Sequence, residues 1–452
     1  MVATIELPIW LFVLILLFAA VTAASHLLFP SVRWFFRRRM ERAVAKLNSK
    51  LERPIEPFKL ARRYDMIQRV IYQPDVAQAV TERAAELGIP ENVAFEEAKR
   101  YAREIVPSFS ASAYFGFAIR VARFLSTALY RVRLVHFDDK GIRGISRDAT
   151  VVFVMNHRSN MDYVLVTYLA AERSALAYAV GEWARVWPLS RLIRAMGAYF
   201  IRRQSRNSLY RSVLAAYVRL ATQGGVTQAM FPEGRLSLNG APQNPKRGLL
   251  KYITDGFDNE IRDVVFVPVA LNYDRVLEDR ILLEALSRGG KGFRARISVV
   301  TGFFLKQIWL RVRGKFHRFG YAAVSFGHPL SLKDFLTGQD GDPAEPLAEE
   351  LMHRINAVVP VLPVPLLAAV IEDAMEPLSP ADIEVQFAAW VVKLSEAHIH
   401  LPRDDLSYAV KLGLRMLSER SIILQTDGCY CVNPEQKDIL GFYANSIRHL
   451  LQ

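Results

Sequence analysis

The chain has 452 residues, of which 51% are hydrophobic, and it carries 58 lysines and arginines against 45 aspartates and glutamates. This length allows two or three domains with a full core, and the net charge of +13 indicates a polyanionic partner, such as phospholipid headgroups, nucleic acid or phosphorylated substrates. Because Cys429 and Cys431 are the only cysteines, the composition excludes a disulfide-stapled secreted domain and favours a reducing compartment.

The first feature in chain order is the uncharged apolar segment Leu7–Phe29, which has the roughly 20 residues that a transmembrane helix needs. Arginines follow it at positions 33, 37, 38, 39 and 42, so the positive-inside rule puts the amino terminus outside and the rest in the cytoplasm. A cleaved signal peptide would carry positive charge at its start, whereas the only early charge here is Glu6. We therefore predict an uncleaved, single-pass anchor over residues 1–32, in the inner membrane if the protein is bacterial.

Three regions follow the predicted anchor. Residues 33–131 have a helical and polar pattern, in which the apolar segment Ala113–Tyr130 suits either a core helix or a helix in the membrane interface. In residues 132–340 strand-like runs alternate with helical stretches, which predicts an α/β domain with a mostly parallel or mixed sheet flanked by helices. Prolines from Pro343 onward mark a junction, and residues 341–452 have helical patterns. The predicted strands are Thr150–Met155, Ala175–Val180, Ala198–Ile201, Thr227–Phe231, Val264–Leu271 and Ala323–Phe326.

Positive charges and aromatic residues are crowded together between Ser287 and Arg318, where Phe303 and Trp309 lie among nine lysines and arginines. This pattern fits a segment at a membrane surface and equally fits a solvated face over a core stripe. A nucleic-acid partner is not expected, because the sequence has neither zinc-finger spacing nor an RNP-like aromatic signature.

No metal site is predicted either. His398 and His400 have no nearby acidic or cysteine partner at a useful spacing, so we interpret them as surface or packing residues. The isolated pair Cys429 and Cys431 offers too few ligands to hold a metal alone.

The stretch with the clearest chemistry is Val151–Ala171. Its apolar run ends at polar residues and an apolar helical pattern follows, which predicts a buried strand, a turn and a helix. In open α/β sheets ligands bind outside the carboxyl ends of strands, where His157 is expected. Asp162 lies five residues later, close enough to hold an imidazole N–H and to stabilise the imidazolium. By spacing alone, the two residues are equally well a general base with its carboxylate or two capping residues.

Two later stretches follow predicted strands and are suited to a phosphorylated ligand. GAYFIRR, residues 197–203, ends in Arg202 and Arg203, whose guanidinium groups can bind phosphate bidentately. In FPEGRLSLNG, residues 231–240, Gly234 lets backbone N–H groups approach a ligand, while Glu233 can accept hydrogen bonds from hydroxyls. Lys246 follows and adds positive charge. Either stretch alone is also compatible with an ordinary surface turn.

A fourth stretch, VVFVPVALNYD at residues 264–274, is a buried strand interrupted by Pro268. In this order NHRSNMD, GAYFIRR, FPEG and VPVALNYDRV resemble the four motif blocks of the acyltransferase family that builds glycerolipids, the first being its H-x4-D block. HRSNMDYVLV and GAYFIRR are similar to the glycerol-3-phosphate and dihydroxyacetone-phosphate acyltransferase branch. The resemblance covers residues 150–330 well and reaches the C-terminus faintly through VSFGHPLSL and FYANSIRHLL.

The third block departs from the family pattern. Where the family usually has arginine, this chain has Leu236, and Arg235 stands one position early while Ser237 stays in register. The further arginine of the branch is replaced by Leu238. The resemblance nevertheless implies substrate contacts from this block and a supporting or acyl-pocket role for Pro268, with more of the phosphate binding left to the GAYFIRR arginines and Lys246.

The resemblance also implies a reaction. A membrane-bound enzyme of this family transfers a fatty acyl group from acyl-CoA or acyl carrier protein to the sn-1 hydroxyl of glycerol-3-phosphate, giving lysophosphatidic acid, the first step of phospholipid synthesis. His157 is then the general base and Asp162 holds it, with no cofactor or metal beyond the thioester co-substrate. Backbone N–H groups at the helix start after His157 are the expected oxyanion donors. Since no G-x-S-x-G elbow occurs, direct attack is favoured over an acyl-enzyme.

Two alternatives stay open at this point. Within the same chemistry, the acceptor can be dihydroxyacetone phosphate, lysophosphatidic acid or another lysophospholipid. From a different class comes a non-catalytic, membrane-anchored protein that binds anionic phospholipid, which the intact His157 and Asp162 argue against.

Overall fold

The computed structural model describes residues 8–49, 51–170, 175–181, 189–202, 205, 207–289, 318–339 and 341–451. Residues 56–171 and 175–452 form one compact unit, and residues 1–55 with 172–174 form a second unit, which contains the helix α1 (Ile9–Asn48). Arg203 and most of the basic segment between Ser287 and Arg318 lie outside the described residues, so the predictions made for them stay predictions.

The predicted anchor, Leu7–Phe29, largely coincides with the first half of α1. Its description is incomplete, because Leu7 and the side chains of residues 23–29 are outside the described part of the chain. Among the residues that are described, no helix combines the length and the apolar composition needed to cross a membrane. The predicted transmembrane helix is therefore not confirmed.

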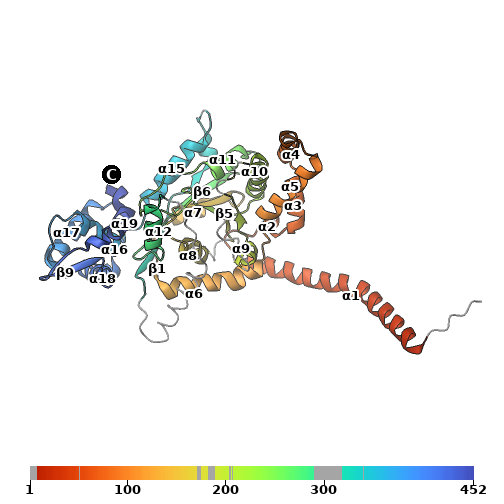
Figure 1. Cartoon of the computed structure of the whole chain (residues 1–452), viewed down its shortest axis with the longest axis horizontal. Helices are drawn as coiled ribbons and strands as arrows, with labels where there is room; N and C mark the ends of the chain where they lie inside the picture. The colour runs from red at the N-terminus through yellow and green to blue at the C-terminus, as the bar shows by residue number, and fades with distance from the viewer. Residues whose placement is uncertain are drawn as a thin grey trace, which may run out of the picture. The chain divides into compact units, whose positions relative to one another are not determined.

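The larger unit has a central sheet covered by helices (Figure 1). Its strands are β1 (Arg131–Phe137), β2 (Thr150–Met155), β3 (Ala177–Val180), β4 (Tyr199–Phe200), β5 (Gln228–Met230), β6 (Val264–Tyr273), β7 (Tyr321–Phe326), β8 (Leu330–Ser331), β9 (Ile423–Thr426) and β10 (Cys429–Val432). Its helices before β2 are α2 (Pro57–Leu60), α3 (Arg63–Ile71), α4 (Pro74–Leu87), α5 (Glu91–Ile105), the π-helix η1 (Ser112–Ala118), α6 (Ile119–Leu129) and α7 (Asp139–Gly144).

The remaining helices alternate with the later strands and then dominate the C-terminal region. They are α8 (Met161–Leu169), α9 (Leu189–Ala195), α10 (Ser208–Gln223), α11 (Gly248–Asp255), α12 (Asp279–Ser287), α14 (Leu332–Leu336), α15 (Ala344–Ala357), α16 (Pro363–Asp373), α17 (Pro380–Lys393), η3 (Pro402–Asp404), α18 (Leu406–Ser418), η4 (Pro434–Gln436), α19 (Lys437–Arg448) and η5 (His449–Leu451).

The main sheet is mixed, with the strand order β1-β7-β6-β2-β5-β3-β4 and with β8 added beside β6. Strands β6, β2, β5, β3 and β4 are parallel neighbours, so their carboxyl ends meet at one edge, whereas β7 and β8 run antiparallel to β6. The prediction of an α/β fold with a mostly parallel or mixed sheet flanked by helices is confirmed.

Both faces of the sheet are buried. In β2 the side chains of Val151, Phe153 and Met155 belong to one apolar cluster with α6, α8 and α16–α19, while Val152 and Val154 belong to a second cluster with α3–α5, α10, α11 and α15. Figure 1 shows α10, α11 and α15 on the opposite side of the sheet from α6 and α8. A strand buried on both faces reads as a continuous apolar run, which is why the β2 sequence lacks polar alternation.

All six predicted strands are present, with boundaries that differ by up to two residues. The edge strand β1 was not among them, because its arginines and His136 interrupt the apolar pattern. The C-terminal region also contains the hairpin β9–β10, which a purely helical interpretation missed. Its turn is Asp427–Gly428, and both residues have positive φ, the usual signature of a two-residue hairpin turn.

Candidate active site

The carboxyl end of β2 turns directly into α8 and brings His157 against Asp162. The imidazole Nδ1 lies 2.9 Å from Asp162 Oδ2, and both side chains are buried. Just before the turn, Asn156 holds the backbone of Leu271 in β6 with two hydrogen bonds of 3.0 and 2.8 Å. The five-residue spacing therefore closes a histidine–carboxylate pair across one turn, at the sheet edge where it was expected.

Both oxygens of the Asp162 carboxylate accept hydrogen bonds. Besides the imidazole, Oδ2 accepts the backbone N–H groups of Arg158 at 2.7 Å and Ser159 at 3.0 Å. The other oxygen, Oδ1, accepts the hydroxyl of Tyr273, at the end of β6, at 2.6 Å. Burial raises the pKa of Tyr273 well above its usual value, so this hydroxyl keeps its proton and remains a donor. Hydrogen bonds to both oxygens fix the carboxylate, which in turn fixes the imidazole.

These contacts correct one prediction, that the N–H groups just after His157 hold the oxyanion. Arg158 and Ser159 donate their N–H groups to Asp162, Asn160 donates to Glu278 at 3.2 Å, and Met161 donates to the Ser159 hydroxyl at 3.1 Å. The turn uses these donors to order itself and not to receive a ligand. Oxyanion donors have to come from groups other than these four.

A second carboxylate, the half-buried Glu278, orders the far side of the same turn. It accepts the Ser159 hydroxyl at 2.7 Å and the Asn160 side-chain amide at 3.0 Å. Burial raises the Glu278 pKa, and the hydrogen bonds oppose that shift. Because the Ser159 hydroxyl is engaged in this way, the structure gives Ser159 an ordering role.

The FPEG block packs directly on the histidine. The Phe231 ring stacks on the His157 imidazole, with 3.9 Å between ring centroids and 22° between planes. Glu233 accepts the His157 backbone N–H at 3.4 Å, and the Ser237 N–H donates to the His157 carbonyl at 3.0 Å. Gly234 has φ of +71°, a conformation that favours glycine. The structure thus brings Glu233 and Ser237 to His157, as the motif order implied.

Glu233 is unusual because it is a buried carboxylic acid next to the buried His157. Burial raises its pKa to about 8, which the charge of Arg158 opposes. Its Oε2 atom is buried and has no hydrogen-bond partner in the described part of the chain. Arg158 is itself buried: Nη2 donates to the Ser446 carbonyl in α19 at 3.2 Å, while Nε and Nη1 have no partner among the described residues. Arg158 therefore links the site to the C-terminal region.

Arg202 is at the carboxyl end of β4 but has its own partner. Its guanidinium donates to both oxygens of Glu104 in α5, at 2.9 and 2.7 Å, and lies over the rings of Tyr101 and Tyr210. This fork is the arrangement in which arginine binds a phosphate, and here a carboxylate occupies it.

The remaining predicted site residues have different positions. Arg235 and Lys246 are exposed, and the Lys246 N–H donates to the Pro232 carbonyl at 2.7 Å, which folds the lysine over the FPEG turn. Pro268 lies within β6 opposite Val154 of β2, and its carbonyl accepts the Gly327 N–H at 2.8 Å. This position supports the sheet. In the described ranges, no group of three or more histidines, cysteines or acids is placed to hold a metal.

Comparison with known proteins identifies the family of the region that contains this site. Residues 136–272 match the Acyltransferase family model, and residues 308–452 match the model of the glycerol-3-phosphate acyltransferase C-terminal region. The chain belongs to the glycerol-3-phosphate acyltransferase family. Both the histidine–carboxylate turn and the FPEG block lie within the first match, and α19 lies within the second.

Relatives in this acyltransferase family extend over most of the chain. The glycerol-3-phosphate acyltransferase of Xanthomonas campestris pv. campestris is 27% identical over 86% of this chain and 46% of its own length, and that of Pseudomonas fluorescens is 28% identical over 86% and 48%. The chain therefore spans about half the length of these relatives. The solved 1-acyl-sn-glycerophosphate acyltransferase of Thermotoga maritima is 18% identical with a TM-score of 0.32, covering 54% of this chain and 76% of its own, a likeness too low to support an argument.

Sequence reasoning missed four residues that shape this candidate site. Phe231 and Tyr273 lie inside the third and fourth motif blocks, so their place in those blocks was an available signal. Arg158 is inside the first block, but nothing in the sequence indicates that it is buried. Glu278 lies outside every block and contacts the turn from 118–119 positions away, a distance at which no spacing rule applies.

Proposed function

We propose that this chain transfers a fatty acyl group from a thioester, acyl-CoA or acyl carrier protein, to the sn-1 hydroxyl of glycerol-3-phosphate, forming lysophosphatidic acid. The buried 2.9 Å contact between His157 Nδ1 and Asp162 Oδ2 at the carboxyl end of β2 carries the proposal. Two further observations support it: the family to which the chain belongs, and its relatives, which are glycerol-3-phosphate acyltransferases.

The proposed mechanism follows from the orientation of the imidazole. Since Nδ1 faces Asp162, Nε2 is the atom that takes the proton from the acceptor hydroxyl, and Asp162 stabilises the imidazolium that forms. The hydroxyl oxygen attacks the thioester carbonyl, the tetrahedral intermediate collapses, and His157 returns the proton to the departing thiolate. General-base catalysis of this kind contributes roughly 10²–10⁴-fold. No cofactor or metal is part of this proposal.

Substrate contacts are proposed for the residues around this pair. Glu233, Gly234, Arg235, Ser237 and Lys246 form one turn beside His157, so they are assigned to the acceptor. Arg203 is assigned to the acceptor phosphate on its sequence position alone. Arg202 has its fork on Glu104 and is assigned a supporting role at the strand end.

The same proposal puts the enzyme at a membrane, with its catalytic unit on the cytoplasmic face and the amino terminus outside. In α1 the described side chains from Ile9 to Val21 expose large apolar groups, with Ile9 82% and Phe18 73% exposed. In the larger unit, Phe117 and Phe124 are 52% and 60% exposed on η1 and α6. Deleting residues 1–30 should weaken co-flotation with phospholipid vesicles without abolishing it. A truncated chain that floats as well as the full chain would contradict the role given to α1.

The proposed reaction is tested with an acceptor panel and one long-chain thioester. We expect the purified chain to acylate glycerol-3-phosphate and to release one thiol for each product formed. Lysophosphatidic acid, dihydroxyacetone phosphate and water are the competing acceptors. If the protein acylates lysophosphatidic acid alone, the acceptor is lysophosphatidic acid and not glycerol-3-phosphate. If it acylates no acceptor, the non-catalytic alternative is favoured.

A further inference from the structure

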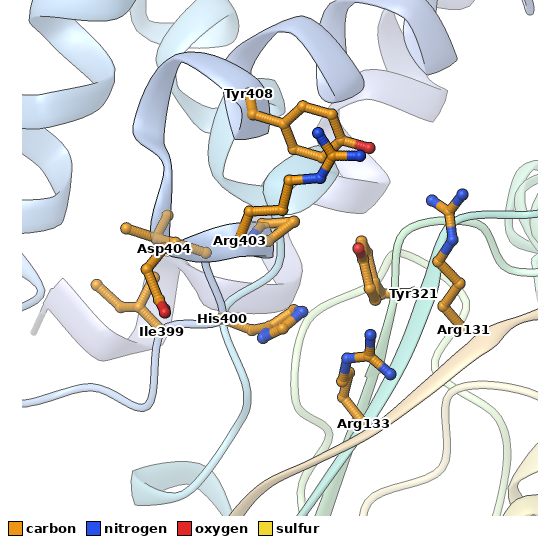
Figure 2. A pocket seen from close by; sticks show the side chains of 10 residues that line it. Arg131, Arg133, Tyr321, Ile399, His400, Arg403, Asp404 and Tyr408 are labelled. Carbon is orange, nitrogen blue, oxygen red and sulfur yellow. The ribbon is translucent and has the colours of Figure 1, made fainter.

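A cavity of about 420 Å³ lies between the edge strand β1 and the segment that precedes α18. Figure 2 shows Arg131 and Arg133 on one wall and Arg403 on the other, with Tyr321 and His400 between them. Arg131 and Arg133 are two residues apart on one strand, so they point to the same face of the sheet. This volume is within the range of small-molecule sites.

The lining has an excess of positive charge. Three arginines face a single carboxylate, that of Asp404, among the described lining residues. The Arg131 and Arg133 guanidinium carbons lie 5.7 and 5.4 Å from the Tyr321 ring centroid, so both flank one aromatic ring. Like charges gathered around a cavity repel each other, and an anion in that cavity removes the repulsion.

On the opposite wall, two residues have an unfavourable backbone conformation. Arg403 has φ of +64° and Asp404 has φ of +54°, values that side-chain-bearing residues seldom adopt. This conformation holds the Arg403 guanidinium 4.2 Å from the Tyr408 ring centroid. Backbone strain of this kind persists at ligand sites because it positions a group in advance.

His400 adds a buried ring nitrogen to the lining of the cavity. Its ring packs against Tyr321 with 4.7 Å between centroids. Its Nε2 atom is buried and has no hydrogen-bond partner within the described chain. A buried polar atom without a partner costs free energy, which a ligand that accepts its hydrogen bond would recover.

This cavity lies at the same sheet edge as the catalytic pair. Tyr321 begins β7, and its N–H donates to Asp274 Oδ2 at 2.8 Å, directly after β6 ends. The preceding residue, Tyr273, points to the other face of the sheet, where it donates to Asp162. Since β2, β6, β7 and β1 are consecutive strands, the wall formed by β1 is three strand spacings from β2, about 14 Å.

That separation decides which substrate can reach both places. Glycerol-3-phosphate has five bonds from its sn-1 oxygen to phosphorus, fewer than two residues of backbone, and extends about 6 Å. In a thioester donor the pantetheine arm between sulfur and phosphate has the length of about four backbone residues, about 14 Å when extended. Of the two substrates, only the donor has a length comparable to this separation between the strands.

We propose that the cavity lined by Arg131, Arg133, His400 and Arg403 binds the phosphate of the acyl donor's phosphopantetheine group. This inference rests on the proposed function, because it takes the donor to be a thioester. Coenzyme A and acyl carrier protein share that phosphate chemistry. Arginine forks supply bidentate contacts and His400 supplies one further N–H.

Binding alone tests the cavity without any turnover. The non-reactive probe is adenosine 3′,5′-bisphosphate, titrated calorimetrically into the full chain. We expect the double variant Arg131→Gln/Arg133→Gln to bind it at least tenfold more weakly, as expected when charge-assisted hydrogen bonds are lost. Arg143→Gln is the matched control, since that side chain is 72% exposed and pairs with Asp139 on α7. Equal binding by the double variant and the control would overturn the proposal.

Kinetics then distinguish the two sources of phosphate. The double variant should raise KM for the acyl donor at least tenfold, with kcat and the glycerol-3-phosphate KM close to wild type. An effect on acyl-CoA alone assigns the cavity to the nucleotide-bearing donor, an effect on acyl carrier protein alone assigns it to the carrier, and no effect on either contradicts it. The single variant Arg133→Gln, at an exposed position, repeats the test if the double variant fails to fold.

The His157→Ala variant separates this proposal from the proposed reaction. It should lose turnover and keep wild-type affinity for adenosine 3′,5′-bisphosphate. If wild-type protein binds the bisphosphate through these arginines but acylates nothing, the reaction is wrong and the anion site stands. If the wild-type protein turns over normally and the double variant has unchanged bisphosphate affinity and donor KM, the reaction stands and the anion site is wrong.

Discussion

The carboxyl ends of β2 and β4 lie at the same edge of one sheet, yet they use their polar side chains differently. At the end of β2, Asp162 accepts hydrogen bonds from its own turn and from Tyr273, and it fixes His157. At the end of β4, the guanidinium of Arg202 is bound to Glu104 from α5. Position at the strand end is therefore a weaker guide to function than the partner that each side chain finds.

The difference comes from the range of the deciding contact. His157 and Asp162 are five residues apart, so the turn brings them together whatever the rest of the chain does. Arg202 and Glu104 are 98 residues apart, and only the packing of α5 beside β4 joins them. A motif predicts a role well when its own residues satisfy one another.

The largest expected effect is the loss of the base at the β2 end. His157→Ala should lower turnover by about 10²–10⁴-fold without unfolding the protein, because the proton acceptor is removed. Asp162→Asn should leave a trace of activity, since the imidazole remains but loses its orientation and charge partner. Steady-state rates together with a circular dichroism melt check both variants. A rate above about a tenth of wild type in His157→Ala would show that His157 is not the general base.

The next effect compares two adjacent arginines at the β4 end. Arg203→Ala should raise KM for glycerol-3-phosphate roughly tenfold to a hundredfold, as expected for a lost charge-assisted phosphate contact, and Arg203→Lys should recover part of it. The acyl-donor KM should barely change. Arg202→Ala is the matched control, and it should lower the free energy of unfolding by about 1–3 kcal/mol because the bidentate pair with Glu104 is lost. If Arg202→Ala gives the larger KM change, the assignment of the two arginines is reversed.

A smaller effect is expected from Tyr273, which holds Asp162 from β6. Tyr273→Phe removes the 2.6 Å hydrogen bond to Oδ1 but keeps the ring. We expect kcat to fall about tenfold with both KM values unchanged, which corresponds to about 1.4 kcal/mol. Tyr163→Phe, whose ring also lies near His157, is the comparison variant. A loss of stability with unchanged kcat would mean that Tyr273 serves folding alone.

The smallest effect concerns the pH dependence of stability. Burial raises the Glu233 pKa from its ordinary 4.5 to about 8, so the folded protein binds this proton more tightly than the unfolded chain does. The resulting stabilisation is complete below about pH 4.5 and is lost as the pH rises through about 8. Glu233→Gln should therefore flatten the fall in denaturation midpoint between pH 5 and about 8, whereas exposed Glu260→Gln should not. Parallel wild-type and Glu233→Gln curves would contradict the shift.

The sequence was sufficient for the central strands and for the contact between His157 and Asp162. Val151–Met155 is uniformly apolar because β2 is buried on both faces, and the polar turn that follows is defined by its own hydrogen bonds. It was insufficient for the oxyanion donors, because the acids that occupy the turn's N–H groups include Glu278, more than a hundred residues away. It was also insufficient for β1, where Arg131 and Arg133 line a cavity and break the apolar pattern of an edge strand.

The long reach of the contacts around His157 also has a consequence for refolding. The bonds that hold this turn join residues separated by 76, 111, 119 and 288 positions, the last from Arg158 to Ser446. Closing such loops costs chain entropy before the contacts repay it, so they form late on the folding pathway. After dilution from denaturant, helical circular dichroism should recover first and acyl transfer last. Enzymatic activity would then report the completion of the tertiary structure, and a chain arrested part-way would be helical but inactive.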